Sequence, residues 1–594
     1  MSLKQKVFLL IVILLAIFFR FDRIRTMPGG LFPDEAANGL DINLMQAGHL
    51  QPFYERGNGR EALFFYMEWA STAMFGKGQW QFHATSALVG VLTVLAIYFA
   101  AYRLFLLDAG PVSPDYADDE YRRKKRRAIN IGLLAAFLTA VSTWHVVLSR
   151  TAFRANLTPL FGAATLYFLL RVYQASSKKS QIWFATLTGV TFALGFYTYI
   201  AFRIMAPVLF MIIVWPLLGA VKRKEFWKTI NNYKLSVISF IGSFLVFVAW
   251  IADYFYHNFS YFLGRSGQVS IFNQSLYTVN GIQLVSKPPL LAVVSVFWQV
   301  TKTAVLGFFT NGDLNWRQNI SGFPLLSPLI SPFFGVGLAI ICVLGIWYFF
   351  APNKRAGYWK YFLLTGWFWG MLLPELATAE GIPHGLRSAG AIAPVFIITA
   401  WALYEFAQLM LKLHKKLWRH VVHKDHDPDW ANANSFMPLR MRIVNFSLKI
   451  LVACFCVALI LQTYFLYFVY AANSPEYFYS FRADLTPVSQ YLRERCSKQN
   501  TYLILDKFSV QTTDYLTSDP SGNFEDKCNV PYIQVDPENS WQLPPLTAGQ
   551  EVVFTQSSIY DTVKFKQYHP EAHLYLEVRN QFGQAVMGVY KGNN

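Results

Sequence analysis

Apolar stretches recur along this chain and are separated by short polar or charged segments. Most are about 17 to 25 residues long, the length that an α-helix needs to cross a hydrocarbon core of about 30 Å. The pattern predicts eleven membrane-spanning helices. The first lacks a convincing small-residue cleavage site, so we interpret it as an anchor rather than a signal peptide. The predicted spans are residues 7–24, 84–106, 129–149, 157–173, 182–200, 204–220, 235–257, 332–351, 361–377, 386–411 and 443–470.

The spans leave two long connecting segments, residues 25–82 and 257–332. The first contains two helix-like stretches with apolar faces, Asp34–Ala47 and Glu61–Phe75, which suit helices lying in a membrane interface. The second contains an apolar stretch, Leu290–Phe309. We interpret this stretch as an interfacial or re-entrant helix, because a further span would reverse the orientation of the basic loops that follow it.

The pattern changes after Tyr470, where short extended stretches alternate with helix-like ones. This alternation is typical of a small α/β domain with a sheet. We therefore predict a membrane domain over residues 1–472 and an α/β domain over residues 473–594. The predicted strands are Thr501–Leu505, Tyr532–Val535, Glu551–Thr555, Leu574–Val578 and Ala585–Tyr590, and the predicted helices are Thr486–Arg495 and Ile559–Gln567.

The composition fits a membrane protein, and the distribution of charge predicts how the chain is oriented in the membrane. Of the 594 residues, 54% are hydrophobic and 15% are charged, with a net charge of +17. The basic residues concentrate in loops that share one side of the membrane, which the positive-inside rule assigns to the cytoplasm. The excess therefore reflects topology rather than nucleic-acid binding. It predicts a multi-pass plasma-membrane protein with a cytoplasmic N-terminus, with residues 25–82, 257–332 and the C-terminal domain outside. The basic groups are Lys4 and Lys6 and the segments 122–127, 178–179, 222–224, 354–355 and 412–442.

The five cysteines show no spacing typical of a zinc site. Cys342, Cys454 and Cys456 lie within predicted spans, where they act as small apolar packing residues. Cys496 and Cys528 lie in the external domain, where oxidation is allowed. The sequence leaves open whether these two are bonded to each other.

An acidic pair, Asp34-Glu35, lies in the first external segment, close to the predicted membrane surface. One interpretation is structural, since Pro33-Asp34-Glu35 makes a good helix N-terminus and the helix dipole favours carboxylates there. The other is chemical. One carboxylate would deprotonate an acceptor hydroxyl or amine, while the other orients it or helps to hold a cation.

Arginines gather at the predicted external ends of the spans and in the external loops, where the topology rule disfavours cations. Any one of them is explained by snorkelling to lipid headgroups. As a set they are better explained by a lipid phosphate or diphosphate bound at bilayer depth, because the planar guanidinium fork suits phosphate. The set comprises Arg60, Arg150, Arg154, Arg203, Arg317 and Arg387, with His384 close to the last of these.

Several segments carry a further signal, among them Phe32–Ala36, Gly59–Tyr66, Phe82–Val94, Asn311–Asn319 and Pro383–Ser388. Together they resemble bacterial glycosyltransferases of the protein-mannosyltransferase and aminoarabinose-transferase type, often called family 39. These enzymes have the GT-C fold and depend on polyprenyl-phosphate sugars. The resemblance covers most of residues 1–411. It implies that Asp34 is the catalytic carboxylate, with Glu35 beside it, and that Arg60 lies near the donor phosphate. Relatives have Pro-Pro-Leu after that basic residue, where this chain has Glu61-Ala62-Leu63.

We therefore expect a polytopic α-helical membrane protein of GT-C type with about eleven transmembrane helices and a small extracytoplasmic α/β domain. It would transfer a hexosyl or pentosyl group, with inversion, from a polyprenyl-phosphate carrier to a protein, glycolipid or polysaccharide on the non-cytoplasmic face. The sequence indicates no particular cofactor and leaves open whether a divalent cation is bound. Membrane lipids are expected partners. The alternative function is a transporter or flippase for lipid-linked sugars or other anions, which would also explain the arginines and the many spans. The expected catalytic residues are Asp34 and Glu35, and the expected donor-phosphate ligands are Arg60, Arg150, Arg154, Arg203, His384 and Arg387.

Overall fold

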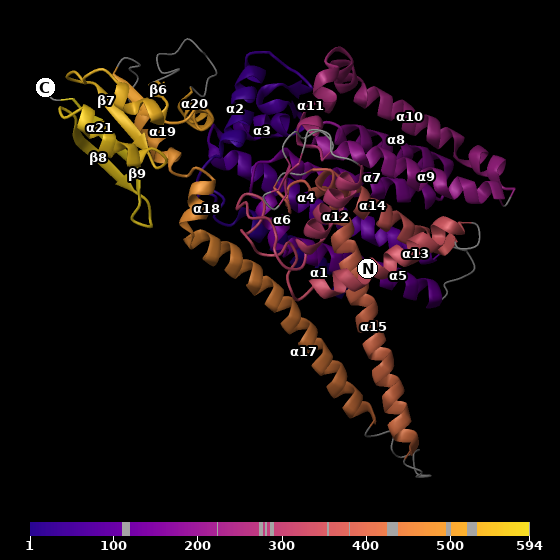
Figure 1. Cartoon of the computed structure of the whole chain (residues 1–594). Coiled ribbons are helices and arrows are strands. Elements are labelled where there is room, and N and C mark those ends of the chain that lie inside the picture. Colours follow the sequence, from indigo (N-terminus) through magenta and orange to yellow (C-terminus); the bar gives the residue numbers. More distant parts are fainter. Residues whose placement is uncertain are drawn as a thin grey trace.

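The protein is a predominantly helical bundle with a sheet-containing domain attached at one side (Figure 1). The computed structural model describes residues 1–109, 119–222, 224–271, 277–279, 282–284, 290–352, 356–378, 381–424, 437–494, 500–518 and 532–592. The chain begins within the helical part and ends in the sheet domain, at the opposite side of the view.

A long helix lies over each of the eleven predicted spans. Six helical stretches of the described chain are long and apolar enough, by length and composition, to cross a membrane. The count of eleven spans therefore stays a prediction. The helices are α1 (Leu3–Phe21), α4 (Gln79–Leu106), α5 (Asp119–Ala140), α7 (Leu157–Tyr173), α8 (Lys178–Gly195), α9 (Met205–Lys222), α10 (Phe226–His257), α13 (Ser331–Phe350), α14 (Trp359–Leu376), α15 (Ile392–Lys424) and α17 (Met437–Tyr464).

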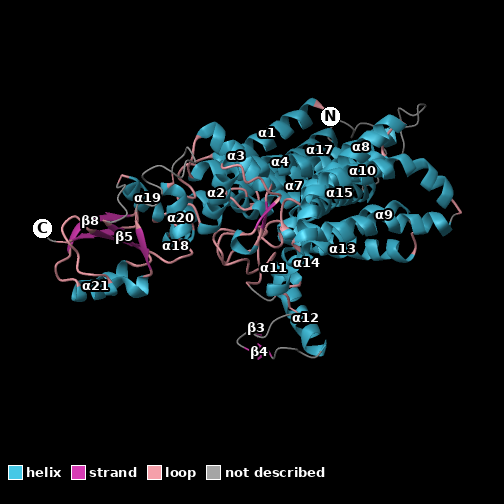
Figure 2. Ribbon diagram, turned by 90° about the horizontal axis from the view of Figure 1, so that it is seen from above, coloured by secondary structure: helices cyan, strands magenta, loops and turns pink. Residues whose placement is uncertain are grey.

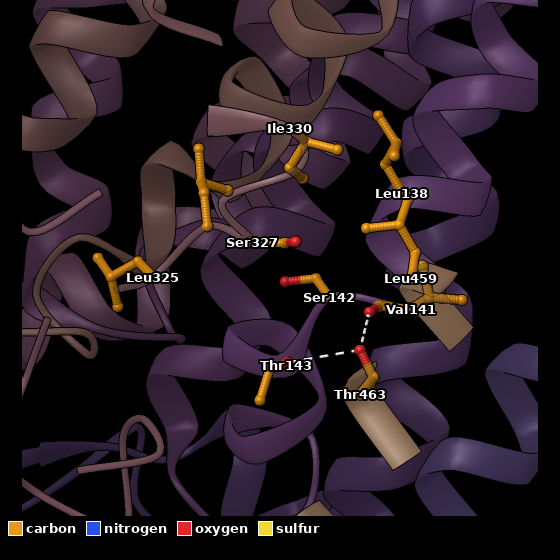
Figure 3. Close-up of a pocket in the computed structure, with 10 residues that line it drawn as sticks. Leu138, Val141, Ser142, Thr143, Leu325, Ser327, Ile330, Leu459 and Thr463 are labelled. Carbon is orange, nitrogen blue, oxygen red and sulfur yellow. Dashed lines mark hydrogen bonds between the residues drawn. The ribbon is translucent and has the colours of Figure 1, made fainter. Parts of the chain in front are cut away.

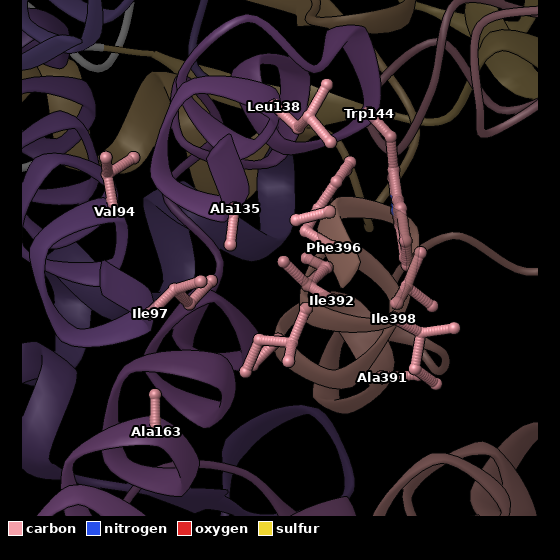
Figure 4. Close-up of a cluster of buried hydrophobic side chains, with 14 of the residues drawn as sticks. Val94, Ile97, Ala135, Leu138, Trp144, Ala163, Ala391, Ile392, Phe396 and Ile398 are labelled. Atoms are coloured by element: carbon pink, nitrogen blue, oxygen red, sulfur yellow. The ribbon is translucent and has the colours of Figure 1, made fainter. Parts of the chain in front are cut away.

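Helix α4 is the centre of the bundle and packs against α1, α5 and α7. The core between these helices and α15 is apolar, and Figure 4 shows Ile97 of α4, Ala135 of α5 and Phe396 of α15 within one cluster. Lipid is as apolar as these side chains, so helix association in a membrane depends on close packing rather than on escape from water. Small residues make that approach close: a methyl group at Gly132 would lie 3.0 Å from the backbone oxygen of Tyr98.

The segment between α1 and α4 forms the two predicted helices, α2 (Pro33–Gln46) and α3 (Leu63–Phe75). A short antiparallel pair, β1 (Phe53–Tyr54) and β2 (Arg60–Glu61), connects them. Helix α2 begins at Pro33 because proline presets the helical φ and lacks the N–H that would be unsatisfied at this position. The predicted helix over Leu290–Phe309 is present as α12 (Leu290–Leu306), which extends from the edge of the bundle (Figure 2).

The remaining elements of the membrane domain are short. They are α6 (Thr143–Leu148), α11 (Phe259–Val269), and an antiparallel pair, β3 (Tyr277–Val279) and β4 (Ile282–Leu284). Helix α18 (Pro475–Ser480) follows α17 and leads into the sheet domain.

All five predicted strands are confirmed and form one mixed sheet in the order β6-β5-β7-β9-β8. Strand β5 pairs in parallel with β6 and β7, and β9 is antiparallel to β7 and β8. Alternate residues face opposite sides of a strand, so Leu503 and Val553 enter one apolar core while Ile504 and Phe554 enter the other. The elements are β5 (Thr501–Ile504), β6 (Ile533–Val535), β7 (Glu551–Thr555), β8 (His573–Arg579), β9 (Ala585–Lys591), α19 (Leu485–Arg493), α20 (Val510–Thr517) and α21 (Thr562–Tyr568).

The sheet domain packs directly onto α2 through its helix α20. The Thr512 hydroxyl donates to the Leu31 carbonyl at 3.0 Å. The Tyr515 ring lies so close to Gly39 that a methyl group there would be 2.4 Å from a ring carbon. Through these contacts the C-terminal domain supports the helix that carries the acidic pair.

Cys496 and Cys528 lie outside the described residues, so the question of a bond between them stays open.

Candidate active site

A cavity of about 730 Å³ lies between α2, the β1–β2 connection and the loops at the ends of α6, α8 and α14. Its ionisable lining residues come from widely separated parts of the chain. They are Asp34, Arg60, Glu61, Arg154, Arg203, Tyr199, Tyr261, Arg317, His384 and Arg387.

A second hollow, of about 10 Å³, is shown in Figure 3. It lies between Ser142, Thr143, Ser327 and apolar side chains, and Thr463 donates to the Val141 carbonyl at its edge. This volume suits about one water molecule. Since its described lining carries no charged side chain, we place the chemistry in the larger cavity.

Asp34 is exposed at the first turn of α2 and lines the larger cavity. Its carboxylate has no hydrogen-bond or ion-pair partner among the residues that the structure describes. Its backbone carbonyl accepts a hydrogen bond from Arg60 at 3.1 Å. The side chain is thus open to a ligand, while its helix is held in place from behind.

Glu35 lies beside Asp34 in sequence but not in the cavity lining. It is completely buried, and its carboxylate accepts hydrogen bonds from the backbone N–H of Phe32 at 2.9 Å and of Ala152 at 2.6 Å. The ring of His83 lies 3.6 Å away. The bond to Phe32 is a helix-capping contact, and the bond to Ala152 ties α2 to the loop after α6. The capping interpretation of the acidic pair therefore describes Glu35, whereas Asp34 stays free for chemistry.

Arg60 lines the cavity, but its guanidinium is already engaged. It donates to the Asn38 side chain at 2.8 Å and to Asp41 at 2.7 Å, and Arg56 contacts the other Asp41 oxygen at 2.9 Å. Burial lowers the pKa of Arg60 to about 10, against the opposing effect of Asp41. Arg60 is therefore charged at neutral pH and holds α2 against β2.

Arg154 and Arg203 share one carboxylate, that of Glu61. The distances from Glu61 are 3.1 Å to Arg154 Nε and 3.0 Å to Arg203 Nη2. Arg203 also donates to the Phe262 carbonyl and lies over the rings of Phe255 and Phe262. Glu61 is the position where the chain departs from the Pro-Pro-Leu of the resembled family. The group keeps a net positive charge, since two guanidinium groups face one carboxylate.

Arg150 was expected at the same site, and the structure places it elsewhere. Its buried guanidinium donates to the carbonyl oxygens of Phe19, Asp22 and Met27 and to the Tyr467 hydroxyl. These contacts join the end of α1 and the loop after it to the helical segment that follows α17. Arg150 is absent from the lining of the cavity, so we no longer assign it to a phosphate.

His384 and Arg387 line the cavity from the loop between α14 and α15. That loop is fixed by carboxylates: Glu375 accepts from the His384 N–H at 2.9 Å, and Asp313 accepts from the Gly385 N–H at 2.8 Å. Burial raises the pKa of Asp313 to about 6, although hydrogen bonds from the backbone N–H groups of Asn315 and Gly385 favour its ionised form.

Arg317 lines the cavity, and the sequence analysis assigns it no role beyond membership of the arginine set. It lies in the loop between α12 and α13, and its guanidinium lies over the Phe32 ring at 3.4 Å. Phe32 immediately precedes Pro33 and Asp34, so this contact brings Arg317 next to the acidic pair. The loop has no regular period that would reveal such a contact, and the only signal was its place in the Asn311–Asn319 segment.

A bound metal ion is not indicated by side-chain clusters in the described residues. Within those ranges, no three His, Cys, Asp or Glu side chains gather as they would around a cation. Asp34 could contribute one ligand oxygen, with the others supplied by substrate or water, as Mg²⁺ allows.

Comparison with known proteins was made by sequence and by structure. No protein family and no curated protein matches the chain by sequence. The structure is similar to ArnT from Cupriavidus metallidurans bound to undecaprenyl phosphate, with a TM-score of 0.54, 13% identity and coverage of 99% of this chain and 98% of that one. It also matches the Archaeoglobus fulgidus oligosaccharyltransferase in the apo form, with a TM-score of 0.46, 13% identity and coverage of 99% and 74%.

The match to ArnT extends over both the helical bundle and the C-terminal domain. At 13% identity it establishes the architecture and leaves the chemistry to be argued from the cavity. The protein thus has the GT-C fold, as the resemblance in the sequence predicts.

Proposed function

We propose that this protein is an integral-membrane glycosyltransferase that takes a sugar from a polyprenyl-phosphate carrier. The observation that carries the proposal is the exposed carboxylate of Asp34, which no described residue pairs with, in a cavity lined by arginines. A neutral or cationic ligand would not need so many guanidinium groups, whereas a phosphate oxygen accepts from them readily. The fold is shared with ArnT, whose structure contains undecaprenyl phosphate.

In the proposed reaction, the nucleophilic atom of the acceptor attacks the anomeric carbon from the side opposite the phosphate. Asp34 takes the acceptor proton, the bond between the anomeric carbon and the phosphate oxygen breaks, and the lipid phosphate leaves with the bonding electrons. A single displacement of this kind inverts the anomeric centre. General-base assistance of this type is worth about 10²–10⁴-fold in rate.

Cavity cations would offset the charge that develops on the leaving phosphate. Arg154, Arg203, His384 and Arg387 are proposed to surround the donor, while Arg60 and Glu35 position the helix that carries Asp34. A divalent cation bridging Asp34 and a phosphate oxygen is compatible with this arrangement and would reinforce the same effect.

The orientation of the cavity follows from the charge distribution. The basic loops favour a cytoplasmic N-terminus, and Asp34 follows the opposite end of α1 in the chain. The acceptor, a protein, glycolipid or polysaccharide, would therefore react on the extracytoplasmic face of the plasma membrane. Whether the donated group is a hexose or a pentose depends on contacts with the bound sugar.

Reconstitution tests the proposal directly. The purified protein in nanodiscs would be incubated with a panel of polyprenyl-phosphate sugars and with cell-envelope acceptors, and release of free polyprenyl phosphate would be followed by mass spectrometry. We expect release with one donor class and a matching increase in acceptor mass. Movement of intact lipid-linked sugar between leaflets of vesicles, without cleavage, would instead support a flippase.

A further inference from the structure

The guanidinium of Arg317 is fixed at one nitrogen, and its two terminal nitrogens have no hydrogen-bond partner among the described residues. Its Nε donates to the Asn315 side-chain oxygen at 3.0 Å. Asn315 is in turn held by Asp313, which accepts from its backbone N–H at 2.8 Å. Neither terminal nitrogen of Arg317 has a hydrogen-bond partner within the described part of the chain, and Nη1 is shielded from solvent. A buried donor without an acceptor is costly, so this arrangement calls for a ligand.

Three other arginines of the cavity, Arg60, Arg154 and Arg203, differ in this respect. Arg60 is paired with Asp41, and Arg154 and Arg203 are both paired with Glu61. Much of their hydrogen-bonding capacity is used to hold the walls of the cavity. Arg317 has no carboxylate within ion-pair distance among the described residues, so its charge is available to an anion.

The position of Arg317 relative to Asp34 also matters. The contact with Phe32 places the guanidinium against the residue two positions before Asp34. Burial lowers the pKa of Arg317, and the nearby carboxylates of Asp34, Glu35 and Asp313 oppose that shift. An anion bound by Arg317 would therefore lie near the carboxylate that accepts the acceptor proton.

We propose that Arg317 is a catalytic residue whose guanidinium donates a hydrogen bond to the phosphate of the lipid carrier. The inference rests on the proposed function and names the contact that receives the leaving group. As the bond from the anomeric carbon to the phosphate oxygen breaks, the electron pair moves onto that oxygen, and the terminal nitrogens of Arg317 stabilise the added charge. The sugar is transferred to the acceptor, and the acceptor proton goes to Asp34.

Two measurements on the full-length protein in nanodiscs test this role. The first is binding of undecaprenyl phosphate, and the second is the transfer rate with the donor that the reconstitution assay selects. Arg317→Gln removes the charge but keeps a polar side chain for Asn315. We expect its affinity for undecaprenyl phosphate to fall about 10- to 100-fold and kcat to fall about 10²-fold. Arg317→Lys keeps the charge without the planar fork and should recover part of both.

Arg103→Gln is the matched control. Arg103 is also a partly buried arginine with an unpaired nitrogen, but it lies in α4 outside the cavity and contacts Gln174. We expect its lipid affinity and turnover to stay within about twofold of wild type, because its charge does not face the ligand. Thermal unfolding measured in parallel separates lost binding from lost structure. If Arg317→Gln does not fold, the lipid affinity and kcat of Arg317→Lys are compared with those of wild type instead.

The outcomes distinguish the two proposals. Wild-type protein that binds undecaprenyl phosphate through Arg317 but transfers no sugar would contradict the glycosyltransferase and support the phosphate contact. A folded Arg317→Gln protein with wild-type affinity and wild-type turnover would overturn the role of Arg317 and leave the glycosyltransferase standing. Wild-type protein that does not bind the lipid phosphate at all would overturn both.

Discussion

Two sets of charged residues share the cavity and differ in how their charges are satisfied. In the paired set, which comprises Arg60, Glu61, Arg154 and Arg203, each side chain has an oppositely charged partner within 3.1 Å. In the open set, which comprises Asp34 and Arg317, the charged ends have no such partner among the described residues. The paired set fixes the walls of the cavity, and the open set is left for the substrate.

The comparison separates charges that stabilise the fold from charges that act on the substrate. A buried ion pair that loses one partner costs about 3–5 kcal/mol, because the other charge is left without compensation. Loss of a charge in the paired set is therefore expected to act first on stability, and loss of a charge in the open set first on turnover. The predictions below separate these two kinds of effect.

The largest expected effect is on turnover in the open set. Asp34→Asn keeps the shape of the side chain and caps a helix about as well as aspartate, but it cannot accept the acceptor proton. We expect a loss of about 10²–10⁴-fold in transfer rate, with affinity for undecaprenyl phosphate changed far less. The rate would be measured as release of polyprenyl phosphate, with thermal unfolding as the control. Near-normal transfer by a well-folded variant would remove Asp34 from the mechanism.

The next effect is on stability, at the neighbouring residue. Glu35→Ala removes the acceptor of the Phe32 and Ala152 N–H groups and the contact with His83. We expect a loss of about 2–6 kcal/mol in the free energy of unfolding, because each buried donor left without an acceptor costs about 1–3 kcal/mol. The loss would be measured by equilibrium unfolding in mixed micelles. Glu35→Gln keeps one acceptor oxygen and should lose less. Equal, small losses for both variants would contradict a positioning role for Glu35.

A smaller effect, an increase in ligand affinity, is expected when the paired set loses its carboxylate. Glu61→Gln releases Arg154 and Arg203 from their shared carboxylate. We expect the free energy of unfolding to fall by about 3 kcal/mol, the low end of the range for a buried pair, because Arg154 is partly exposed. Affinity for undecaprenyl phosphate should rise severalfold, because two guanidinium groups become available to the anion. The double variant Glu61→Gln with Arg154→Gln should return toward the wild-type value. A fall in affinity for the single variant would show that Glu61 positions these arginines for the ligand.

The smallest effect concerns pH. Burial raises the pKa of Asp313 to about 6, compared with about 3.9 in an unfolded chain. Between these values the folded protein holds a proton that the unfolded chain has lost, so the contribution to stability is present below about pH 4 and is lost as the pH rises through about 6. The difference in unfolding free energy between wild type and Asp313→Asn should change by on the order of 2 to 3 kcal/mol over that window. A constant difference would exclude this titration.

The sequence predicted the elements well because their signals are local. Apolar runs and alternation located the long helices and the five strands of the sheet, and Pro33 located the start of α2. The resemblance to GT-C enzymes supplied the architecture that the match to ArnT establishes.

The roles of individual charged residues were harder to predict because they depend on distant partners. Arg150 and Arg154 are four positions apart, yet Arg150 holds α1 to the segment after α17 and Arg154 lines the cavity. The buried Glu35 carboxylate accepts a hydrogen bond from the backbone N–H of Ala152, which is more than 100 positions away in the chain. Arg317 meets Phe32 only in the folded chain. No local pattern in the sequence encodes these contacts.

The most direct test of the account is a cryo-electron microscopy structure of the protein in nanodiscs with a non-hydrolysable polyprenyl-phosphate sugar. We expect the phosphate oxygens within hydrogen-bond distance, about 3 Å, of the terminal nitrogens of Arg317, and the sugar between that phosphate and Asp34. A phosphate bound outside this cavity, or a sugar whose anomeric carbon faces away from Asp34, would contradict the account.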